Sequence, residues 1–229
     1  MTRPLVIRDL GLVAYDLAYE QQKQLVEAKR ADGNLADYLL LLEHPEVYTY
    51  GRKSKAEEIP QDGIEIERGG QVTFHNPGQL VGYPILRLEP GRRDLHRYLR
   101  WLEDRLIVTL ARFGIVAGRR DGATGVWVND GQQKIASIGV AVSGWVTYHG
   151  FALNVCNELK GFAKIHPCGF DSRVMTSMLE LLGAADCPSM ESVKAEILRE
   201  FAAHSWMGGQ PFLEEAAESE KIFGKTAYV

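Results

Sequence analysis

The sequence predicts an α+β protein, with a mixed, largely antiparallel β-sheet packed with helices. Three observations indicate this class. Segments with helical apolar spacing are separated by several short β-type runs, as in α+β folds. Asp130-Gly131 and Ser143-Gly144 are turn pairs of the kind that close antiparallel hairpins. Finally, the chain has no G-x-x-x-x-G-K-[ST] motif and no G-x-G-x-x-G motif between a strand and a helix, which disfavours nucleotide-binding folds.

Length and charge narrow the class of protein. The chain has 229 residues, so we expect a single domain over residues 1–207, followed by a C-terminal extension over 208–229. Apolar residues make up 45% and charged residues 24%, which is typical of a globular protein rather than a disordered one. A net charge of −4 argues against a dedicated nucleic-acid-binding protein, because such proteins usually carry a basic face.

The sequence also bears on where the protein works. No uninterrupted apolar run approaches the ~20 residues needed to span a membrane. Arg8 and Asp9 interrupt the apolar run near the start, so we predict no signal peptide. The three cysteines are few, odd in number and widely spaced, which fits a reducing compartment. We therefore expect a cytoplasmic protein.

In the first half of the chain, helical spacing favours one helix over residues 13–30, ended by Asp32-Gly33-Asn34. Tyr38 to Glu43 is apolar without alternation, which indicates a strand buried on both faces. Residues 52–62 are polar and charged, as expected of a surface loop. Further β-type runs are 5–8, 47–50, 64–68, a short run around His75, and a strand from Leu80.

In the second half, a helix is expected from about Gly91 to Gly114, with Asp94 as its N-cap. Two shorter helices are expected over 177–182 and 191–206, and residues 161–170 have no regular pattern. The tail after Gly208-Gly209 is predicted to be a loosely held extension. The β-type runs in this half are 115–117, 126–129, 134–142 and 145–155.

The chemistry is expected to centre on one stretch, R-G-G-Q-V-T-F-H-N-P-G-Q-L-V-G-Y-P at residues 68–84. Gly69 and Gly70 let a ligand approach the main chain, and Pro77-Gly78 is a turn signal. Such a segment would line a pocket with backbone N–H groups, one imidazole and one guanidinium. An ordinary hairpin between two sheet strands is the alternative.

Cys168 is the best candidate for a nucleophile. It lies in I-H-P-C-G-F, between proline and glycine in an irregular segment, whereas Cys156 and Cys187 show no such setting. A thiol needs a nearby cation to lower its pKa, and Lys134, which enters an apolar strand, is a candidate. A lysine that protects an edge strand and a buried, inert cysteine are the alternatives.

Two further groups of residues are open to interpretation. His44, His75, His149 and His166 lie beside turn residues, but their spacing matches no common zinc motif, so structural histidines are favoured and no metal is predicted. The arginines at 92, 93, 97 and 100 form a basic cluster. This cluster is either a solvated helix face or a docking patch for an acidic partner.

Four motifs together resemble the octanoyltransferases, the lipoyl(octanoyl) transferases of lipoate synthesis. They are R-G-G-Q-V-T-F-H-N-P-G-Q (68–79), K-I-A-S-I-G (134–139), Y-H-G-F-A-L-N-V (148–155) and I-H-P-C-G-F (165–170), in the family's order and spacing. The stretch 43–51 also resembles the family, and the likeness covers about residues 5–205. The extension over 208–229 matches nothing in the family.

The resemblance implies a fold shared with biotin and lipoate protein ligases. It also implies transfer of an octanoyl group from octanoyl-acyl carrier protein to a lysine of lipoyl-carrier domains, namely those of 2-oxoacid dehydrogenases and the glycine-cleavage carrier protein. The implied enzyme needs no cofactor, because transfer from a thioester to an amide runs downhill without ATP, and we expect neither nucleic acid nor membrane as a partner.

The resemblance also assigns residue roles. Cys168 would hold the acyl group as a thioester, and Lys134 would lower the pKa of that thiol and assist proton transfer. Independently of the resemblance, the developing oxyanion needs hydrogen-bond donors, which backbone N–H groups around Gly78, Gly139 or Gly169 could supply. The acyl-binding residues would be Arg68, Gly69, Gly70, Gln71, Val72, Thr73, Phe74, His75, Ser137, Ile138, Gly139, Gly150, Phe151 and Ala152, with His44, His75 and His149 lining the site.

Two other functions remain open at this point. An ATP-dependent ligase on the same fold would use free acid and ATP, and would ignore acyl carrier protein. A noncatalytic binder of carrier domains would need neither Cys168 nor Lys134.

Overall fold

The computed structural model describes residues 3–165, 170–203 and 211–213. Its helices are α1 (Tyr15–Ala31), α2 (Leu95–Arg112), α3 (Met178–Leu182) and α4 (Met190–Ala203). Short 3₁₀ helices cover Ala56–Glu58, Pro90–Arg92, Lys160–Lys164 and Ser172–Val174. None of the helices in these ranges is long and apolar enough to cross a membrane.

The described strands form one large and one small sheet. The large sheet contains β1 (Leu5–Leu12), β2 (Asp37–Glu43), β6 (Gln79–Ile85), β7 (Ala117–Arg120), β8 (Ala123–Val128), β9 (Gln133–Ser143), β10 (Val146–Asn154) and β11 (Pro211–Leu213), in the order β11-β1-β2-β6-β10-β9-β8-β7. The small sheet contains β3 (Val47–Tyr50), β4 (Ile64–Glu65) and β5 (Thr73–His75), in the order β4-β3-β5.

Most strand pairs are antiparallel. From β2 through β6, β10, β9 and β8 to β7, every neighbouring pair runs antiparallel, and tight turns join β8 to β9 and β9 to β10. Only β1 pairs parallel with its two neighbours in the large sheet, and β3 pairs parallel with β4 in the small one. The predicted mixed, largely antiparallel α+β fold is confirmed.

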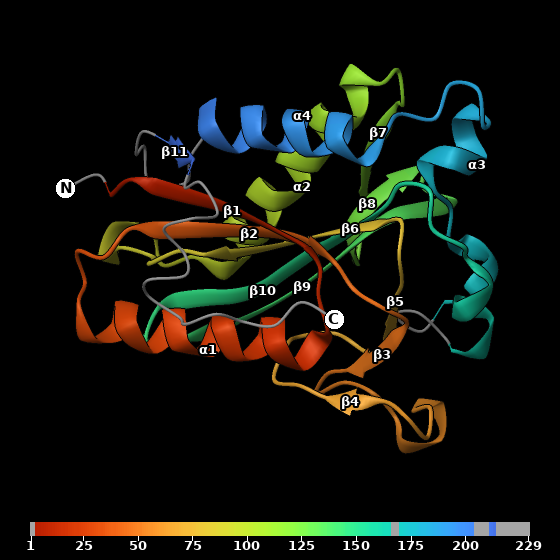
Figure 1. Ribbon diagram of the computed structural model, residues 1–229. Helices are drawn as coiled ribbons and strands as arrows, with labels where there is room; N and C mark the ends of the chain where they lie inside the picture. The colour runs from red at the N-terminus through yellow and green to blue at the C-terminus, as the bar shows by residue number, and fades with distance from the viewer. Residues whose placement is uncertain (1–2, 166–169, 204–210, 214–229) are drawn as a thin grey trace.

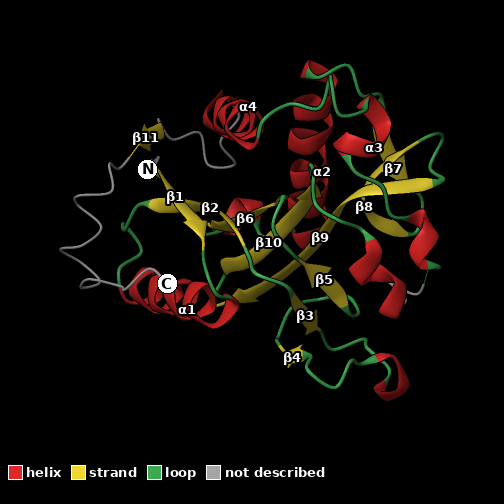
Figure 2. Ribbon diagram, turned by 45° about the vertical axis from the view of Figure 1, so that its right-hand side comes forward, coloured by secondary structure: helices red, strands yellow, loops and turns green. Residues whose placement is uncertain are grey.

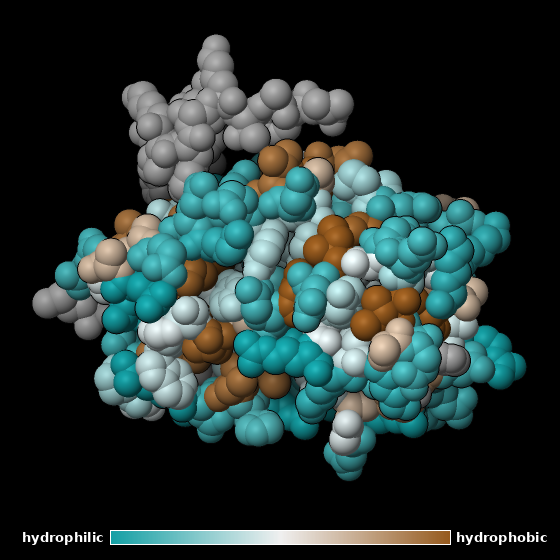
Figure 3. All heavy atoms as spheres, turned by 90° about the horizontal axis from the view of Figure 1, so that it is seen from below, coloured by the Kyte–Doolittle hydropathy of each residue, from teal (hydrophilic) through white to brown (hydrophobic). Residues whose placement is uncertain are grey.

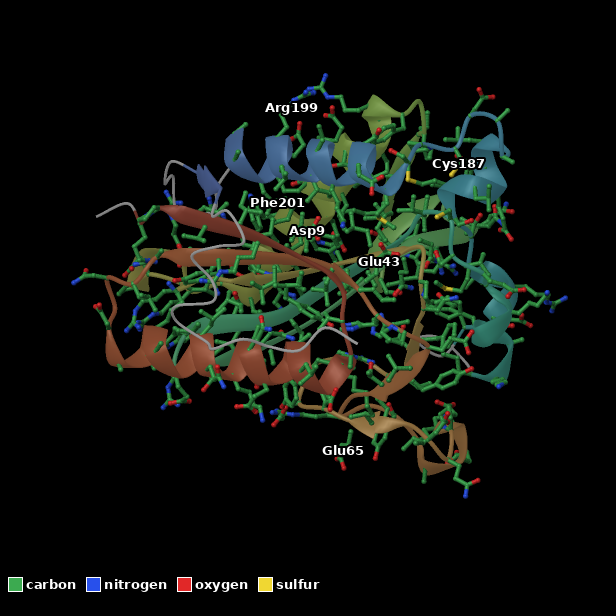
Figure 4. All side chains as sticks on the ribbon, viewed as in Figure 1. Asp9, Glu43, Glu65, Cys187, Arg199 and Phe201 are labelled. Atoms are coloured by element: carbon green, nitrogen blue, oxygen red, sulfur yellow. The ribbon has the colours of Figure 1, made fainter. Side chains whose placement is uncertain are left out.

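Helices cover both faces of the large sheet. Helix α1 lies on one face, while α2 and α4 lie together on the other (Figures 1 and 2). On α4, Phe201 points toward the sheet and is buried against Phe151, whereas Arg199 points away from it (Figure 4). The molecule is therefore a three-layer stack with a hydrophobic core on each side of the sheet.

Strand β2 explains why its sequence lacks alternation. Leu39 and Leu41 are buried in the core beneath α2 and α4, while Leu40 and Leu42 are buried in the core beneath α1. A strand covered by helices on both faces needs apolar residues at every position. The predicted strand over residues 38–43 is confirmed, as is the N-cap at Asp94, whose carboxylate accepts the Arg97 N–H at 3.0 Å.

Two predicted strands have other bounds in the structure, and one of them is the run expected over 115–117, where β7 instead covers Ala117–Arg120. The strand expected over 64–68 is only two residues long, and its residues Ile64 and Glu65 pair with Thr49 and Tyr50 of β3. The tail expected to be loosely held includes β11, which pairs parallel with the edge strand β1. Part of the extension predicted to begin after residue 207 therefore completes the sheet.

Exposed apolar side chains are scattered on the face that carries α1 and β4. Figure 3 shows this face, on which apolar side chains form separate patches between hydrophilic ones. Leu17 on α1 and Ile64 on β4 are among the large apolar residues that remain exposed. Isolated apolar residues of this kind are normal on protein surfaces and do not by themselves mark a binding site.

Candidate active site

A narrow cavity lies where the small sheet meets the large one; we call it the histidine cavity. It has a volume of about 50 Å³, and about 490 Å³ of empty space when its solvent-open part is included. Its walls come from α1, the glycine segment before β5, and strands β5, β6, β9 and β10. They are Tyr15, Ile66, Arg68, Gly69, Gly70, Gln71, Thr73, His75, Tyr83, Ser137, Ile138, Gly139, His149, Gly150, Phe151 and Ala152.

The glycine segment is fixed from behind by Arg68. Its guanidinium donates to the Thr49 carbonyl oxygen at 2.9 Å, to the Thr49 hydroxyl at 3.2 Å and to the Gly69 carbonyl oxygen at 3.1 Å. Gly139 on β9 permits this packing, because a Cβ there would lie 3.1 Å from both the Arg68 side chain and the Gly69 carbonyl oxygen. The segment is thus a rigid backbone wall rather than a free loop.

Two histidines beneath this wall are held neutral. His44 lies close to the Val13 carbonyl oxygen through Nδ1 (2.7 Å) and to the Tyr83 hydroxyl through Nε2 (2.8 Å). His75 Nδ1 lies 2.6 Å from the Gln79 side-chain oxygen. Burial lowers the pKa of His44 to about 4 and that of His75 to about 3. Both imidazoles therefore act as hydrogen-bonding groups, and not as cations, at neutral pH.

Each of these contacts fixes a tautomer. A carbonyl oxygen only accepts, so Nδ1 of His44 carries the hydrogen and Nε2 accepts from the Tyr83 hydroxyl. The Gln79 amide nitrogen donates to Phe74 and Asn154 oxygens, so its oxygen faces His75 and Nδ1 of His75 carries the hydrogen. The Nε2 atom of neutral His75 is then an acceptor.

His149 differs from the other two histidines. Its φ of 55° is unusual for a residue other than glycine, and its backbone N–H donates to the Gln22 side-chain oxygen at 2.7 Å. Its ring stacks on Tyr19, with centroids 5.5 Å apart. Burial lowers its pKa to about 3, and its buried Nε2 has no hydrogen-bond partner among the described residues. Backbone strain and an unpaired polar atom are typical of functional sites.

A second, larger cavity lies on the other side of the glycine wall; we call it the lysine cavity. Its volume is about 420 Å³. Gly69, Gly70, Gln71, Ile138 and Gly139 line both cavities and so form a shared wall. The remaining lining residues are Lys53, Leu95, His96, Leu99, Gly122, Ala123, Thr124, Lys134, Val140 and Phe170.

Lys134 reaches the lysine cavity from within the sheet, and its side chain is only 1% exposed. Its ammonium lies over the Trp127 ring, 5.5 Å from the centroid. Gly125 on the neighbouring strand β8 makes room for it, because a Cβ at residue 125 would lie 2.6 Å from the lysine Cε and 3.2 Å from its Nζ. A lysine is rarely this buried unless its charge is compensated, and the chain of Lys134 is held here by its surroundings.

Gly125 is itself held by a buried carboxylate on α2. Glu103 accepts the Gly125 N–H at 3.1 Å through one oxygen. Its other oxygen pairs with Arg100 at 2.7 Å and with Arg119 at 2.9 Å. Because the two arginines compensate its charge, this buried carboxylate fixes β8 where Lys134 crosses it.

A chain of side-chain amides links the two cavities. Gln79, which contacts His75, donates to the Asn154 oxygen at 2.9 Å, and Asn154 donates to the Thr176 carbonyl oxygen at 2.9 Å. The Thr176 N–H donates in turn to the Lys134 carbonyl oxygen at 3.0 Å. The orientation of the cavity histidine is thus coupled to the strand that carries the lysine.

The structure brings most of the predicted site residues together. Of the acyl-binding set, all but Val72 and Phe74 line the histidine cavity. These two side chains point to the opposite side of β5 and are buried with Tyr48, Phe162 and Ile165. The reason is strand alternation, which directs Thr73 and His75 into the cavity and their neighbours away from it.

Other predicted residues lie elsewhere. His44 lies behind Tyr83 and is not part of the lining. The Gly78 N–H donates to a carboxylate oxygen of Glu43, at the end of β2, at 2.7 Å, so it is not available as an oxyanion donor (Figure 4). Lys134 lines the lysine cavity and not the histidine cavity. Cys168, His166 and Gly169 lie outside the described residues.

Sequence reasoning missed three of the lining residues, namely Tyr15, Ile66 and Tyr83. Tyr15 has the spacing of a core residue on a helix, and nothing local to it indicates a cavity. Tyr83 lies inside the glycine-rich stretch of residues 68–84, so the sequence alone could have indicated it as a lining residue. Among the described residues, no cluster of three His, Cys, Asp or Glu side chains suits a metal ion.

Comparisons with known proteins agree with this geometry. Residues 14–202 match the family model of the lipoyl protein ligase A/B catalytic domain. An octanoyltransferase of Syntrophotalea carbinolica is 50% identical over 198 residues, covering 85% of this chain and 92% of the relative. One of Synechococcus elongatus is 44% identical over 220 residues, covering 92% of this chain and 91% of the relative.

Solved structures show the same fold at low identity. A lipoate-protein ligase A bound with ATP superposes with a TM-score of 0.67 at 14% identity, covering 96% of this chain and 92% of the other. A biotin protein ligase from Aquifex aeolicus in complex with biotin and ATP gives a TM-score of 0.53 at 13% identity, covering 87% of this chain and 69% of the other. The chain therefore belongs to the lipoyl protein ligase A/B catalytic domain family and, within it, to the octanoyltransferases.

Proposed function

We propose that the protein takes an octanoyl group from its thioester on acyl carrier protein and passes it to a lysine of a lipoyl-carrier domain, through a thioester on Cys168. The observation that carries this proposal is the buried Lys134 amine, which lies across a glycine wall from a narrow cavity of mainly apolar surface. A buried amine beside an apolar slot is suited to proton transfer in an acyl exchange that excludes water.

The reaction has two balanced steps. In the first, the Cys168 sulfur attacks the thioester carbonyl carbon, the carbon–sulfur bond to the carrier breaks, and the carrier thiol leaves with the proton released from Cys168. In the second, the amine of the acceptor lysine attacks the new thioester. An amide forms, the carbon–sulfur bond to Cys168 breaks, and the amine proton returns to the Cys168 sulfur. Lys134 mediates both proton transfers and favours the thiolate through its charge.

The other two cysteines are poorly suited to this role. Partial desolvation raises the pKa of the Cys156 thiol, although this residue is exposed, and also that of Cys187, which is half-buried beside α3 (Figure 4). A thiol with a raised pKa stays protonated at neutral pH and is a weak nucleophile.

The described residues that follow Cys168 in the chain lie close to Lys134. Phe170, two residues after the cysteine, packs edge-on against Trp127, with ring centroids 5.3 Å apart. The ammonium of Lys134 lies over the same Trp127 ring. Met175, farther along this segment, bridges to Lys134 in the sheet. The segment after Cys168 thus returns to the sheet beside the lysine, which supports a cysteine–lysine pair.

The histidine cavity is proposed to hold the octanoyl chain. Phe151, Ala152 and Ile138 supply apolar walls, and the neutral histidines add no charge that an alkyl chain would have to displace. The carbonyl carbon would then lie at the glycine wall between the two cavities. Backbone N–H groups near Gly139 remain the proposed oxyanion donors.

The partners follow from the chemistry. We propose the lipoyl domains of 2-oxoacid dehydrogenases and the glycine-cleavage carrier protein as acceptors, and a cytoplasmic location, where thiols stay reduced. Within the exposed basic cluster, Arg93 stacks on Trp145 and Arg100 pairs with Glu103, so these two arginines have contacts within the chain. These two arginines therefore stabilise the chain's own packing, whether or not the cluster also binds an acidic partner.

Intact-protein mass spectrometry after mixing with octanoyl-acyl carrier protein, without ATP, tests the proposal. We expect an octanoyl adduct that hydroxylamine removes, that Cys168→Ala abolishes, and that persists in a matched Cys156→Ala, Cys187→Ala double variant. If an octanoyl adduct still formed after Cys168→Ala, the assignment of the thioester to Cys168 would be refuted. Modification only with octanoate and ATP would instead indicate a ligase, and binding without any transfer would indicate a noncatalytic protein.

A further inference from the structure

We propose that the lysine cavity is the channel for the phosphopantetheine arm of the acyl donor, with Lys53 at its mouth binding the phosphate of that arm. The inference rests on the proposed function and adds to it the route of the donor and a residue that recognises it. Such an arm is a slender chain of alkyl, amide and hydroxyl groups, with a phosphodiester at one end and the thioester at the other.

The position of the shared wall separates the two halves of the substrate. A thioester carbonyl has the acyl chain on one side and the leaving sulfur on the other. The cavity that contains Lys134 is the one that lacks His75 and His149, and the segments around Gly69, Gly70 and Gly139 stand between the two. A proton from Lys134 therefore reaches a leaving thiol in the lysine cavity, with the acyl chain across the wall.

The sizes of the two cavities agree with this division. The lysine cavity, at about 420 Å³, is far larger than the histidine cavity, at about 50 Å³. An alkyl chain needs only a narrow slot, whereas an arm with amide and dimethyl groups needs a wider passage. The larger cavity is thus matched to the bulkier half of the donor.

The lining of the lysine cavity changes from its floor to its mouth. Val140 and Lys134 at the floor are buried, whereas Leu95 is 41% exposed and Lys53 and His96 are exposed. The Gln71 amide and Thr124 hydroxyl add polar groups among the apolar ones. A mixed lining of this kind suits a chain in which amide and alkyl groups alternate.

Lys53 is placed to meet a phosphate. Its backbone N–H donates to the Gly70 carbonyl oxygen at 3.2 Å, which ties it to the shared wall. Among the described residues, no acidic side chain pairs with its ammonium, whereas the nearby Lys55 pairs with Glu58. A lysine at the mouth of a channel, joined to the wall that ends at the reacting centre, complements a phosphate at the far end of the arm.

The test measures the rate of octanoyl loading by intact-protein mass spectrometry with two donors. Octanoyl-acyl carrier protein has the whole arm, whereas octanoyl-N-acetylcysteamine has only its thioester end and no phosphate. We expect Lys53→Glu to slow loading from the carrier protein by about tenfold or more, since one charge-assisted contact is worth roughly that factor. Leu95→Trp, which narrows the mouth of the cavity, should slow loading from the carrier protein by a similar factor. Loading from the short thioester should change by less than about threefold.

Two variants serve as controls. Lys53→Arg keeps the positive charge and should load from the carrier protein within about threefold of the unsubstituted rate. Val116→Trp introduces the same bulk at a residue that is 89% exposed and lines neither cavity, and should leave both rates within about twofold.

The remaining outcomes overturn the inference. Equal slowing with both donors, or no slowing with either, would show that the cavity does not discriminate the arm. Slower transfer from the octanoyl enzyme to the lipoyl domain, with loading unchanged, would assign the cavity to the acceptor lysine. Absence of any adduct on the unsubstituted protein would overturn the proposed function and this inference together, so the two failures are distinguishable.

Discussion

Gly125 offers the sharpest test of how Lys134 is positioned. In Gly125→Ala, the new Cβ would lie 2.6 Å from both the Ala136 carbonyl oxygen and the Lys134 Cε. The backbone oxygen belongs to the neighbouring strand β9, so it cannot move aside without shifting the strand that carries Lys134. The lysine side chain would have to leave its present position.

Two effects of this substitution are separable. The φ of 129° at residue 125 strains any residue with a Cβ, at a cost of about 1–3 kcal/mol. For a domain of this size, each 1 kcal/mol lowers Tm by about 2–4 °C. Displacement of Lys134 should in addition slow octanoyl transfer by about 10²- to 10⁴-fold, the range typical of losing a positioned acid–base group.

A matched control isolates the second effect. Gly114, after α2, has a φ of 75°, and a Cβ there meets nothing within 4 Å. Gly114→Ala should cost about 1–2 kcal/mol in unfolding free energy and leave the transfer rate unchanged. Thermal unfolding and single-turnover transfer on both variants make the comparison. If Gly125→Ala folds and transfers the octanoyl group at a rate within about threefold of that of the unsubstituted protein, Gly125 does not position Lys134 for the reaction.

Three further predictions follow from the same contacts. Glu103→Gln keeps an acceptor for the Gly125 N–H, so its transfer rate should exceed that of Glu103→Ala by about tenfold although both variants lose stability to urea; equal rates would contradict this. Because burial lowers the pKa of His75 from 6.5 to about 3, the unfolded chain binds a proton there that the folded one does not, and stability falls as pH drops below 6.5. His75→Gln should therefore reduce the slope of unfolding free energy against pH between pH 4 and 6 by about 1.4 kcal/mol per unit, measured by denaturant titration, and an unchanged slope would show that His75 is not buried neutral. Phe74→Leu should cost about 1–2 kcal/mol in stability without changing preference among octanoyl and decanoyl donors, whereas Phe151→Leu should shift that preference toward the longer chain; a shift with Phe74→Leu would place it in the acyl cavity after all.

Much of the fold was predictable because local patterns and tertiary packing agree. The helix over residues 95–112 has its N-cap at Asp94 and its apolar side against the sheet, as the sequence indicates. The Asp130-Gly131 hairpin forms with positive φ at residues 129–131, as such turns require. The strand β11 was not predictable, since its pairing with β1 depends on a partner about 200 residues away in the chain.

The site was predictable in composition but not in arrangement. Alternation along β5 directs Thr73 and His75 to one side and Val72 and Phe74 to the other, so the sequence could have excluded Val72 and Phe74 from the acyl-binding set. The burial of Lys134 was not predictable, because it depends on the space at Gly125 and on Glu103 from a distant helix. Tyr15 joins the cavity only because α1 packs beside β6 and β10, which no local pattern reveals.

The shared glycine wall restricts how this enzyme can diverge. Because Ile138 and Gly139 face both cavities, a larger side chain on β9 would alter the space for the acyl chain and the space beside Lys134 together. On strand β10, by contrast, Phe151 and Ala152 line only the histidine cavity. Natural or engineered changes in chain-length preference should therefore accumulate on β10, while β9 stays nearly invariant for reasons of geometry rather than of chemistry.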